Sequence, residues 1–199
     1  MLMYTVPLLL LAAGKSSRMG TSKQLLQWKG KTLIEHSVKT GLSMKQEVYV
    51  VLGAYEKKIR QQLNSFPIKI VYNPNWEQGI GTSIAMGVSS VLTHCSEAEG
   101  VFIYLADQPF IDSKAILSFY TSFQKGENQI ITTAYENEKW GVPALFDRCY
   151  FDSLTHLNKD VGAQQLIKEN KENCTPIPFP KSTLVDIDTP KVYQKYKSE

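Results

Sequence analysis

Several separate stretches of the sequence carry residues suited to binding phosphates. The first is residues 12–22, where glycine and hydroxyl residues alternate with Lys15 and Arg18, and Lys23 follows directly. Small residues let a backbone approach a ligand closely, and consecutive N–H groups can bind phosphate oxygens. A guanidinium group adds a planar pair of donors that fits a phosphate. This stretch therefore predicts a loop that binds a polyphosphate.

The loop is not a P-loop, although Gly14-Lys15-Ser16 resembles the end of one. A P-loop requires a glycine five residues before Gly14, and Leu9 holds that position inside an apolar run. The phosphates would instead be bound by an arginine and a lysine that lie apart in the sequence.

Three acidic residues predict a place for a divalent cation. Asp107 follows the apolar run 101–105, and Asp186 and Asp188 flank Ile187. In an extended segment Asp186 and Asp188 point to the same side, and Mg²⁺ binds one or two carboxylates together with phosphate oxygens. The alternative is that these acids cap helices or turns. Capping fits Asp188 better than Asp186, because Asp188 directly precedes Thr189 and a proline.

Residues 73–83 form a second glycine-rich stretch, which includes Asn73, Gly79 and Gly81 and opens a helix. A glycine-rich entry to a helix N-terminus can bind an anion or a polar ligand. The alternative is an ordinary loop in which Thr82 or Ser83 caps the helix. The residues themselves leave both interpretations open.

The elements that must position these residues follow the pattern of βαβ units, because short β-branched runs alternate with amphipathic stretches. Strands are expected at residues 6–11, 47–52, 68–72, 100–105, 130–135 and 143–146, and near Leu184. Helices are expected at residues 32–42, 55–63, 83–92 and 113–124, around Tyr150 and Leu166, and from Thr189. This order predicts a single doubly wound, Rossmann-like α/β domain over residues 1–199, with a mostly parallel sheet. Ligands would lie at the carboxyl ends of its strands, where the strand order reverses.

The composition sets limits on the location and the partners. A net charge of +3 on 199 residues gives no reason to expect nucleic acid or an anionic membrane as a partner. Three widely spaced cysteines fit a reducing compartment. The apolar run 6–13 is too short to span a bilayer, and no Lys or Arg precedes it as in a signal peptide. We therefore expect a cytoplasmic protein.

Taken together, the motifs resemble the molybdenum cofactor nucleotidyltransferases. The similarity is greatest to the cytidylyltransferase branch of the guanylyltransferase-like NTP-transferase superfamily, and it extends over nearly the whole chain. The matching motifs are Leu11-Ala-Ala-Gly-Lys-Ser-Ser-Arg-Met-Gly20, Lys23-Gln-Leu-Leu26, Asn73 with Gly79 and Ser83, Asp107-Gln-Pro109, Gly141-Val-Pro143 and Asp186-Ile-Asp-Thr-Pro190.

The resemblance implies a role for each matching position. The implied catalytic residues are Arg18, Lys23 and Asp107. The implied nucleotide-binding residues are Leu11, Ala12, Ala13, Gly14, Arg18, Lys23, Asn73, Gly79, Thr82 and Ser83. Asp107, with Asp186 or Asp188, would bind Mg²⁺, and Gly141, Pro143 and Gly162 would face the acceptor. The chain departs from the family on that acceptor side, with Val142 where a histidine is common and Gln164 where an arginine is common.

The implied reaction is transfer of CMP from CTP, or of the corresponding group from another NTP, to a phosphorylated acceptor with release of pyrophosphate. The expected acceptor is molybdopterin, and a molybdenum hydroxylase is a candidate partner. Ala13, where the guanylyl branch has glycine, favours CTP over GTP. The alternatives are a sugar-phosphate nucleotidyltransferase, a nucleotide-sugar glycosyltransferase and a non-catalytic carrier of the cofactor.

Overall fold

The computed structural model describes residues 4–197 of the chain. Within these residues the main sheet has seven strands in the order β5-β4-β1-β6-β8-β7-β9. Strands β5, β4, β1 and β6 run parallel, whereas β8 is antiparallel to both β6 and β7. The strands are β1 (Leu8–Ala12), β4 (Val48–Leu52), β5 (Lys69–Tyr72), β6 (Gly100–Leu105), β7 (Ile130–Ala134), β8 (Trp140–Asp147) and β9 (Cys174–Pro178). The mostly parallel α/β sheet predicted from the sequence is therefore confirmed.

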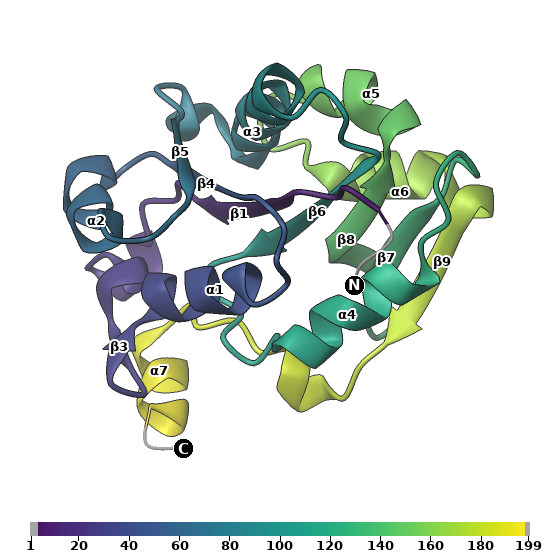
Figure 1. The fold of residues 1–199 in the computed structure, drawn as a ribbon. Coiled ribbons are helices and arrows are strands. Elements are labelled where there is room, and N and C mark those ends of the chain that lie inside the picture. The colour runs from purple at the N-terminus through teal and green to yellow at the C-terminus, as the bar shows by residue number, and fades with distance from the viewer. Residues whose placement is uncertain (1–3, 198–199) are drawn as a thin grey trace.

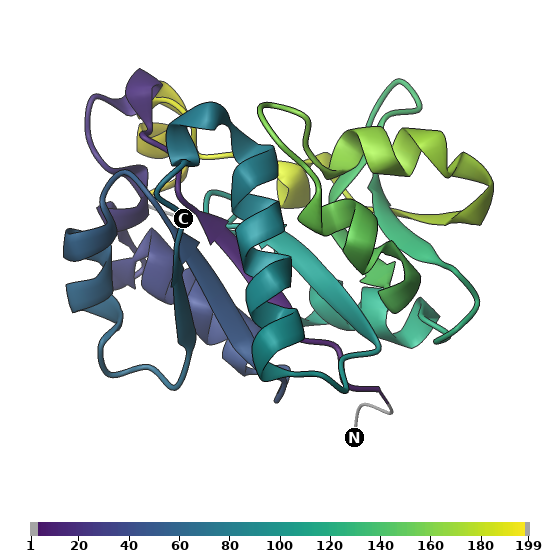
Figure 2. The same cartoon turned by 90° about the horizontal axis from the view of Figure 1, so that it is seen from above.

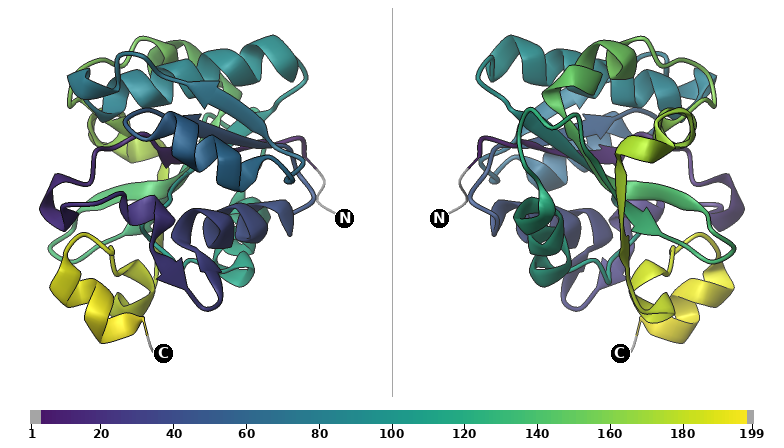
Figure 3. Two further views of the ribbon diagram at one scale, coloured as in Figure 1. Left: turned by 90° about the vertical axis from the view of Figure 1, so that its left-hand side faces the viewer. Right: turned by 90° about the vertical axis from the view of Figure 1, so that its right-hand side faces the viewer.

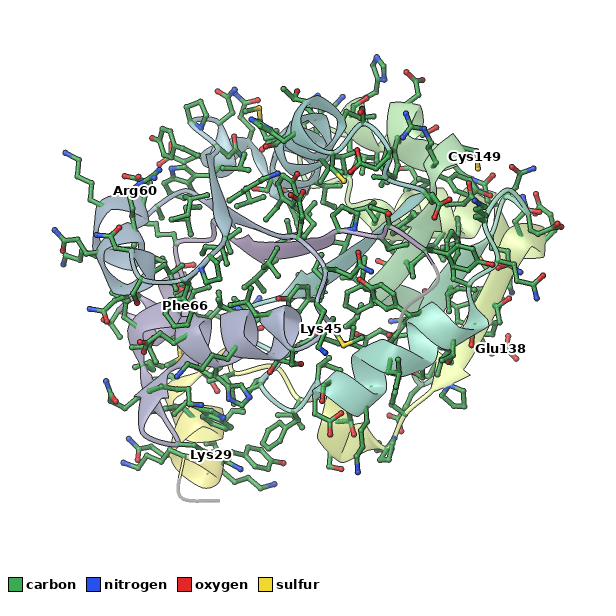
Figure 4. The ribbon with its side chains drawn as sticks, viewed as in Figure 1. Lys29, Lys45, Arg60, Phe66, Glu138 and Cys149 are labelled. Carbon is green, nitrogen blue, oxygen red and sulfur yellow. The ribbon has the colours of Figure 1, made fainter. Side chains whose placement is uncertain are left out.

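Helices cover both faces of this sheet (Figure 1). On one face, buried residues of α1, α2 and α4 pack on the sheet, and on the other face those of α3, α5 and α6 do so. The helices are α1 (Leu33–Leu42), α2 (Glu56–Leu63), α3 (Ile80–His94), α4 (Ser113–Ser122), α5 (Phe151–Thr155), α6 (Ala163–Glu169) and α7 (Pro190–Tyr196). Charged side chains such as those of Lys29, Arg60 and Glu138 lie at the periphery (Figure 4).

Strand β1 lies in the middle of the parallel region, paired with β4 on one side and β6 on the other. Its residues contribute alternately to the two hydrophobic clusters, Leu8 and Leu10 to one and Leu9 and Leu11 to the other. A strand that is buried on both faces needs a continuous apolar run, which explains the run seen in the sequence.

The chain leaves β1 toward β4 and β5 and then returns to the opposite side of β1 with β6. The strand order therefore reverses between β1 and β6, where α/β sheets bind their ligands. The loops that follow β1, precede α3 and precede α6 gather along one edge of the molecule (Figure 2).

One of the expected elements is wrong. Lys181–Leu184 forms a 3-10 turn and not a strand, and the ninth strand is β9, which pairs in parallel with β7 at the edge of the sheet. Because of Pro176 and Pro178, the sequence does not predict a strand at β9, but an edge strand tolerates proline. Helix α3 begins at Ile80, three residues before the expected start, with Gly79 as its N-cap.

A short hairpin of β2 (Gln27–Trp28) and β3 (Lys31–Thr32) precedes α1 and was not expected. It packs beside α7, where the Tyr193 hydroxyl donates to the Gln27 carbonyl at 2.9 Å. Between residues 4 and 197, no helix is both long enough and apolar enough to cross a bilayer.

Candidate active site

The loop after β1 is fixed from inside by Gln24, whose side chain is buried. The Gln24 amide donates to the carbonyls of Ala12 at 3.2 Å and Gly14 at 3.0 Å. Its oxygen accepts from the hydroxyls of Ser22 at 2.9 Å and Ser16 at 3.2 Å. Gln24 stands within the Lys23-Gln-Leu-Leu26 motif, but this role was not predicted from the sequence. One buried amide thus sets the shape of the loop.

The outer side of this loop presents donors to solvent. Ser16 adopts a left-handed backbone conformation with φ 57°, and Gly20 another with φ 68°. Within residues 4–197, the backbone N–H groups of residues 14–17 donate to no protein group. The Arg18 side chain is 77% exposed beside them. Unpaired N–H groups next to a guanidinium form a surface that suits a polyanion.

A partly buried ionic cluster lies under the loop, where the Lys23 ammonium contacts the carboxylates of both Asp107 and Asp188. The lysine side chain is only 15% exposed. Burial lowers the pKa of Lys23, but the charges and hydrogen bonds of the two carboxylates outweigh burial and raise the pKa above its usual value. Arg18 lies 3.7 Å from the second oxygen of Asp188. The Lys23 ammonium thus links the loop after β1 to the end of β6 and to the segment before α7.

Asp186 and Asp188 reach this point because the segment between them is tied to the end of β6. The Ile187 N–H donates to the Asp107 carbonyl at 2.8 Å, and the Ile187 side chain is completely buried near Trp28. The loop after β1 and the segment before α7 lie on the same side of the molecule (Figure 3). The Asp188 N–H donates to the Asp186 carbonyl at 3.1 Å, so the segment turns at Ile187 and is not extended as expected. Thr189, not Asp188, caps α7.

Asp186 differs from its neighbour because it binds an amide and not the lysine. Its carboxylate accepts from the Gln108 amide at 2.9 Å, and the same amide donates to the Tyr135 hydroxyl at 3.3 Å. Burial, followed by the charge of Asp107, raises the pKa of Asp186 to about 6. Burial also raises the pKa of Tyr135 to about 12, so this hydroxyl stays protonated and donates to the Val142 carbonyl.

The donors around Asp107 fit a divalent cation that prefers oxygen. One oxygen of Asp107 is buried without a hydrogen-bond partner, and the other shares a single cation with Asp188. Across the described chain, no three Asp, Glu, His or Cys residues gather into a metal-binding group. A two-carboxylate site completed by phosphate oxygens is the arrangement that Mg²⁺ typically adopts in proteins.

Asn73, Thr82 and Ser83 are tied to one another. The buried Asn73 amide donates to the hydroxyls of Thr82 at 2.9 Å and Ser83 at 3.0 Å, and its oxygen accepts from the Asn75 N–H at 2.9 Å. Neither Thr82 nor Ser83 caps α3, contrary to the alternative considered from the sequence. These hydrogen bonds hold the entry of α3 in place.

The entry of α3 also packs against the loop that precedes α6. Gly79 has φ 116°, and a methyl group on it would collide with the Lys159 carbonyl. The Gly81 N–H donates to the same carbonyl at 3.0 Å. The expected nucleotide side therefore contacts the expected acceptor side directly, next to Gly162.

The acceptor-side segment at residues 141–143 is fixed through its carbonyl groups. Hydroxyl groups of Thr132, Tyr135 and Thr133 donate to the carbonyls of Gly141, Val142 and Pro143, respectively. A cavity of about 850 Å³ lies to the side, between Trp140, Gly162 and α6. Asp107 and Lys23 do not line this cavity.

The side chains of Leu11, Ala12 and Ala13 are buried in the sheet clusters, so these residues can meet a ligand through their backbone. The Ala13 carbonyl accepts from the Ala54 N–H at 3.0 Å. Gly53 leaves room for Trp76, because a methyl group on Gly53 would lie 2.6 Å from both the Trp76 side chain and the Ala13 carbonyl. Gly14 is exposed and open on its Cβ side.

Comparison with known proteins gives a family match over residues 8–174, described as a MobA-like NTP transferase domain. A molybdenum cofactor cytidylyltransferase of Escherichia coli (strain K12) is 33% identical over 100 residues, 49% of this chain and 52% of the relative. A nicotine blue oxidoreductase of Paenarthrobacter nicotinovorans is 32% identical over 130 residues, 64% of this chain and 61% of the relative. The chain thus spans about half to three fifths of the length of these two relatives.

Solved structures share the fold. A nucleotidyl transferase from Methanothermobacter thermautotroptrophicus superposes with a TM-score of 0.82 at 20% identity, over 98% of this chain and 96% of that one. The manganese complex of Rv0371C from Mycobacterium tuberculosis H37Rv gives a TM-score of 0.75 at 20% identity, over 98% and 99% of the two chains.

Proposed function

The chain belongs to the MobA-like NTP transferase family, and from this premise we propose that it transfers CMP from CTP to a phosphorylated acceptor of the molybdopterin type. Nucleotidyl transfer is the activity of the family. The base, the acceptor and the use of Mg²⁺ are the proposed parts. The relative named as a molybdenum cofactor cytidylyltransferase supports the first two.

The observation that carries the proposal is the position of the phosphate-binding surface above the carboxylates. The free N–H groups of residues 14–17 and Arg18 would bind the β- and γ-phosphates. Asp107 and Asp188 lie beneath this surface, where the α-phosphate of a bound triphosphate would lie. These two carboxylates would hold Mg²⁺. The bound cation would polarise the α-phosphate and neutralise charge on the leaving pyrophosphate.

The chemistry requires no general base from the protein. The nucleophile is an oxygen of a phosphate monoester, which is already anionic near neutral pH. It forms the new bond to the α-phosphorus, and the bond from that phosphorus to the bridging oxygen of pyrophosphate breaks. The protein contributes alignment and positive charge, with Arg18 and Lys23 placed beside the oxygens that gain charge.

Asn73, Thr82 and Ser83 would act as positioning residues for the nucleoside. Their mutual hydrogen bonds fix the entry of α3, so Gly79 and the backbone after it would face the base. On the other side, the rigid segment 141–143 and Gly162 would face the acceptor.

The relative named as an oxidoreductase gives a second candidate function, because it matches 64% of this chain. The paired carboxylates argue against it, since hydride transfer develops no charge on the phosphates and needs no metal ion beside them. The same experiment can test both activities.

The test incubates the purified chain with [α-³²P]CTP, Mg²⁺ and a molybdopterin-type acceptor. It follows two products, the labelled dinucleotide and the unlabelled pyrophosphate. We expect both products in equal amounts and only when the acceptor is present. A parallel reaction contains NADPH without CTP. Oxidation of NADPH with the acceptor or a dye, and no transfer from any NTP, would overturn the proposal in favour of an oxidoreductase. Binding of the acceptor with neither reaction would indicate a carrier.

A further inference from the structure

Lys23 fills the space between the two carboxylates that would hold the metal. Its ammonium contacts Asp107 and Asp188 at once, and its side chain is 15% exposed. Lysine carries a compact charge, so a site that fits an ammonium between two carboxylates also fits a small cation. The remaining Asp107 oxygen is buried without a partner, which leaves that carboxylate short of the contacts it can make.

We propose that Lys23 occupies the place of the divalent cation in the metal-free protein, so that the carboxylates become available to the cation only when a polyphosphate draws the lysine away. The inference rests on the proposed function in one respect, namely that Asp107 and Asp188 are the metal ligands.

Local charge supports this coupling. Asp107 and Asp188 carry two negative charges, and Lys23 and Arg18 place two positive charges beside them. Asp186 lies close by and pairs with the neutral Gln108 amide, so its carboxylate adds no positive partner to the cluster. A divalent cation that arrives alone adds two positive charges beside an ammonium, which is unfavourable in a partly buried site. A cation that arrives on a triphosphate brings a net negative charge and offers the lysine new partners.

The loop geometry allows the exchange. Lys23 lies at the start of the 3-10 turn Lys23–Leu25, directly below the free N–H groups of residues 14–17. The backbone of this turn is held by Gln24, so the lysine side chain can change partners while the loop keeps its shape. Lys23 would then bind the triphosphate when it is present and the two carboxylates when it is absent.

The first experiment titrates MnCl₂ into metal-free protein without any nucleotide and measures free Mn²⁺ by its electron paramagnetic resonance signal. Lys23→Met should bind Mn²⁺ about tenfold to a hundredfold more tightly than the wild type, the range expected when a charge-assisted contact no longer competes. Lys23→Arg, which keeps the charge, should bind as weakly as the wild type. The double variant Lys23→Met with Asp188→Asn should lose most of the gain.

Lys15→Met is the matched control, because Lys15 lies in the same loop and forms no salt bridge within residues 4–197. It should leave Mn²⁺ affinity unchanged. If Lys23→Met does not fold, Lys23→Gln replaces it. Equal Mn²⁺ affinity of the Lys23 variant and the wild type, or an equal gain in Lys15→Met, would overturn the proposal.

The second experiment tests the exchange itself with inorganic tripolyphosphate in EDTA, followed by calorimetry. Lys23→Met should bind tripolyphosphate at least several-fold more weakly than the wild type. Unchanged binding would mean that the lysine does not move to the phosphates. Neither experiment contains a base or an acceptor, so a wrong assignment of CTP or molybdopterin would leave both results as they are.

Discussion

Asp107 is the residue on which the proposed chemistry depends most. Asp107→Asn keeps the size of the side chain but removes the charge that a metal ligand needs. We expect nucleotidyl transfer to fall by about a hundredfold or more while the fold survives. Steady-state pyrophosphate release measures the loss. Asp152→Asn, at a side chain that is 89% exposed, is the control and should keep full activity. Normal turnover in a folded Asp107→Asn variant would remove Asp107 from the site.

Asp186 gives the metal-free protein a pH dependence whose sign follows from its pKa. Burial and the charge of Asp107 raise this pKa from 3.8 to about 6. The native state therefore binds the proton more tightly than the unfolded state, and stability falls as the pH rises from about 4 to about 6. Asp186→Asn removes this loss. In EDTA the variant should be more stable than the wild type above pH 7, by about 1–2 kcal/mol after solvent screening is allowed for.

Urea unfolding at pH 4 and pH 7.5 measures this effect as the free energy of unfolding. The advantage of Asp186→Asn should be much smaller at pH 4, where the wild-type carboxyl is protonated in the native state and partly protonated in the unfolded state. An advantage of the same size at both pH values would show that ionisation of Asp186 is not its cause.

Much of the ionic cluster was predictable from residue type and strand position. Asp107, Asp186, Asp188 and Lys23 were all expected near one another, and the structure brings them together. The sequence did not reveal that Lys23 binds the carboxylates, because pairing across 84 and 165 residues depends on the tertiary fold. The hydrogen-bonding role of Gln108 was missed for the same reason.

Among the elements, the contact between the entry of α3 and the loop before α6 is sensitive to substitution. Gly79→Ala would place a methyl group against the Lys159 carbonyl in a backbone with φ 116°. We expect a loss of about 2–4 kcal/mol in the free energy of unfolding, measured in urea. Gly126→Ala is the matched control, because Gly126 has φ 79° and open space around it, and should lose only about 1–2 kcal/mol. Equal losses in the two variants would mean that the contact with Lys159 contributes nothing.

Element order was predictable because β-branched runs and amphipathic stretches alternate clearly up to β7. The elements of the C-terminal part were harder to predict from the sequence. The strand β9 contains two prolines and lies at the sheet edge, so it lacks the signals of a central strand. The two strands of the hairpin β2–β3 have two residues each, too few for an alternating pattern to be recognised.

In the molecule as a whole, β1 lies between β4 and β6, so the loop after β1 lies between the proposed nucleotide side and the proposed acceptor side. The nucleotide would lie over the loop after β1 and the entry of α3, and the acceptor would lie over β8 and the loop before α6, with the carboxylates between them. Ala13 belongs to the nucleotide side, where its methyl group is buried in the same cluster that Trp76 packs against. An alanine here restricts the backbone more than the glycine of the guanylyl branch would, which favours the smaller pyrimidine base.

The most direct measurement is therefore kcat/KM for CTP, GTP and ATP with one molybdopterin-type acceptor and the wild-type chain. CTP should be preferred by about tenfold to two-hundredfold, the range that a small steric difference in a pocket can supply. Equal use of GTP, or a clear preference for ATP, would contradict the assignment as a cytidylyltransferase.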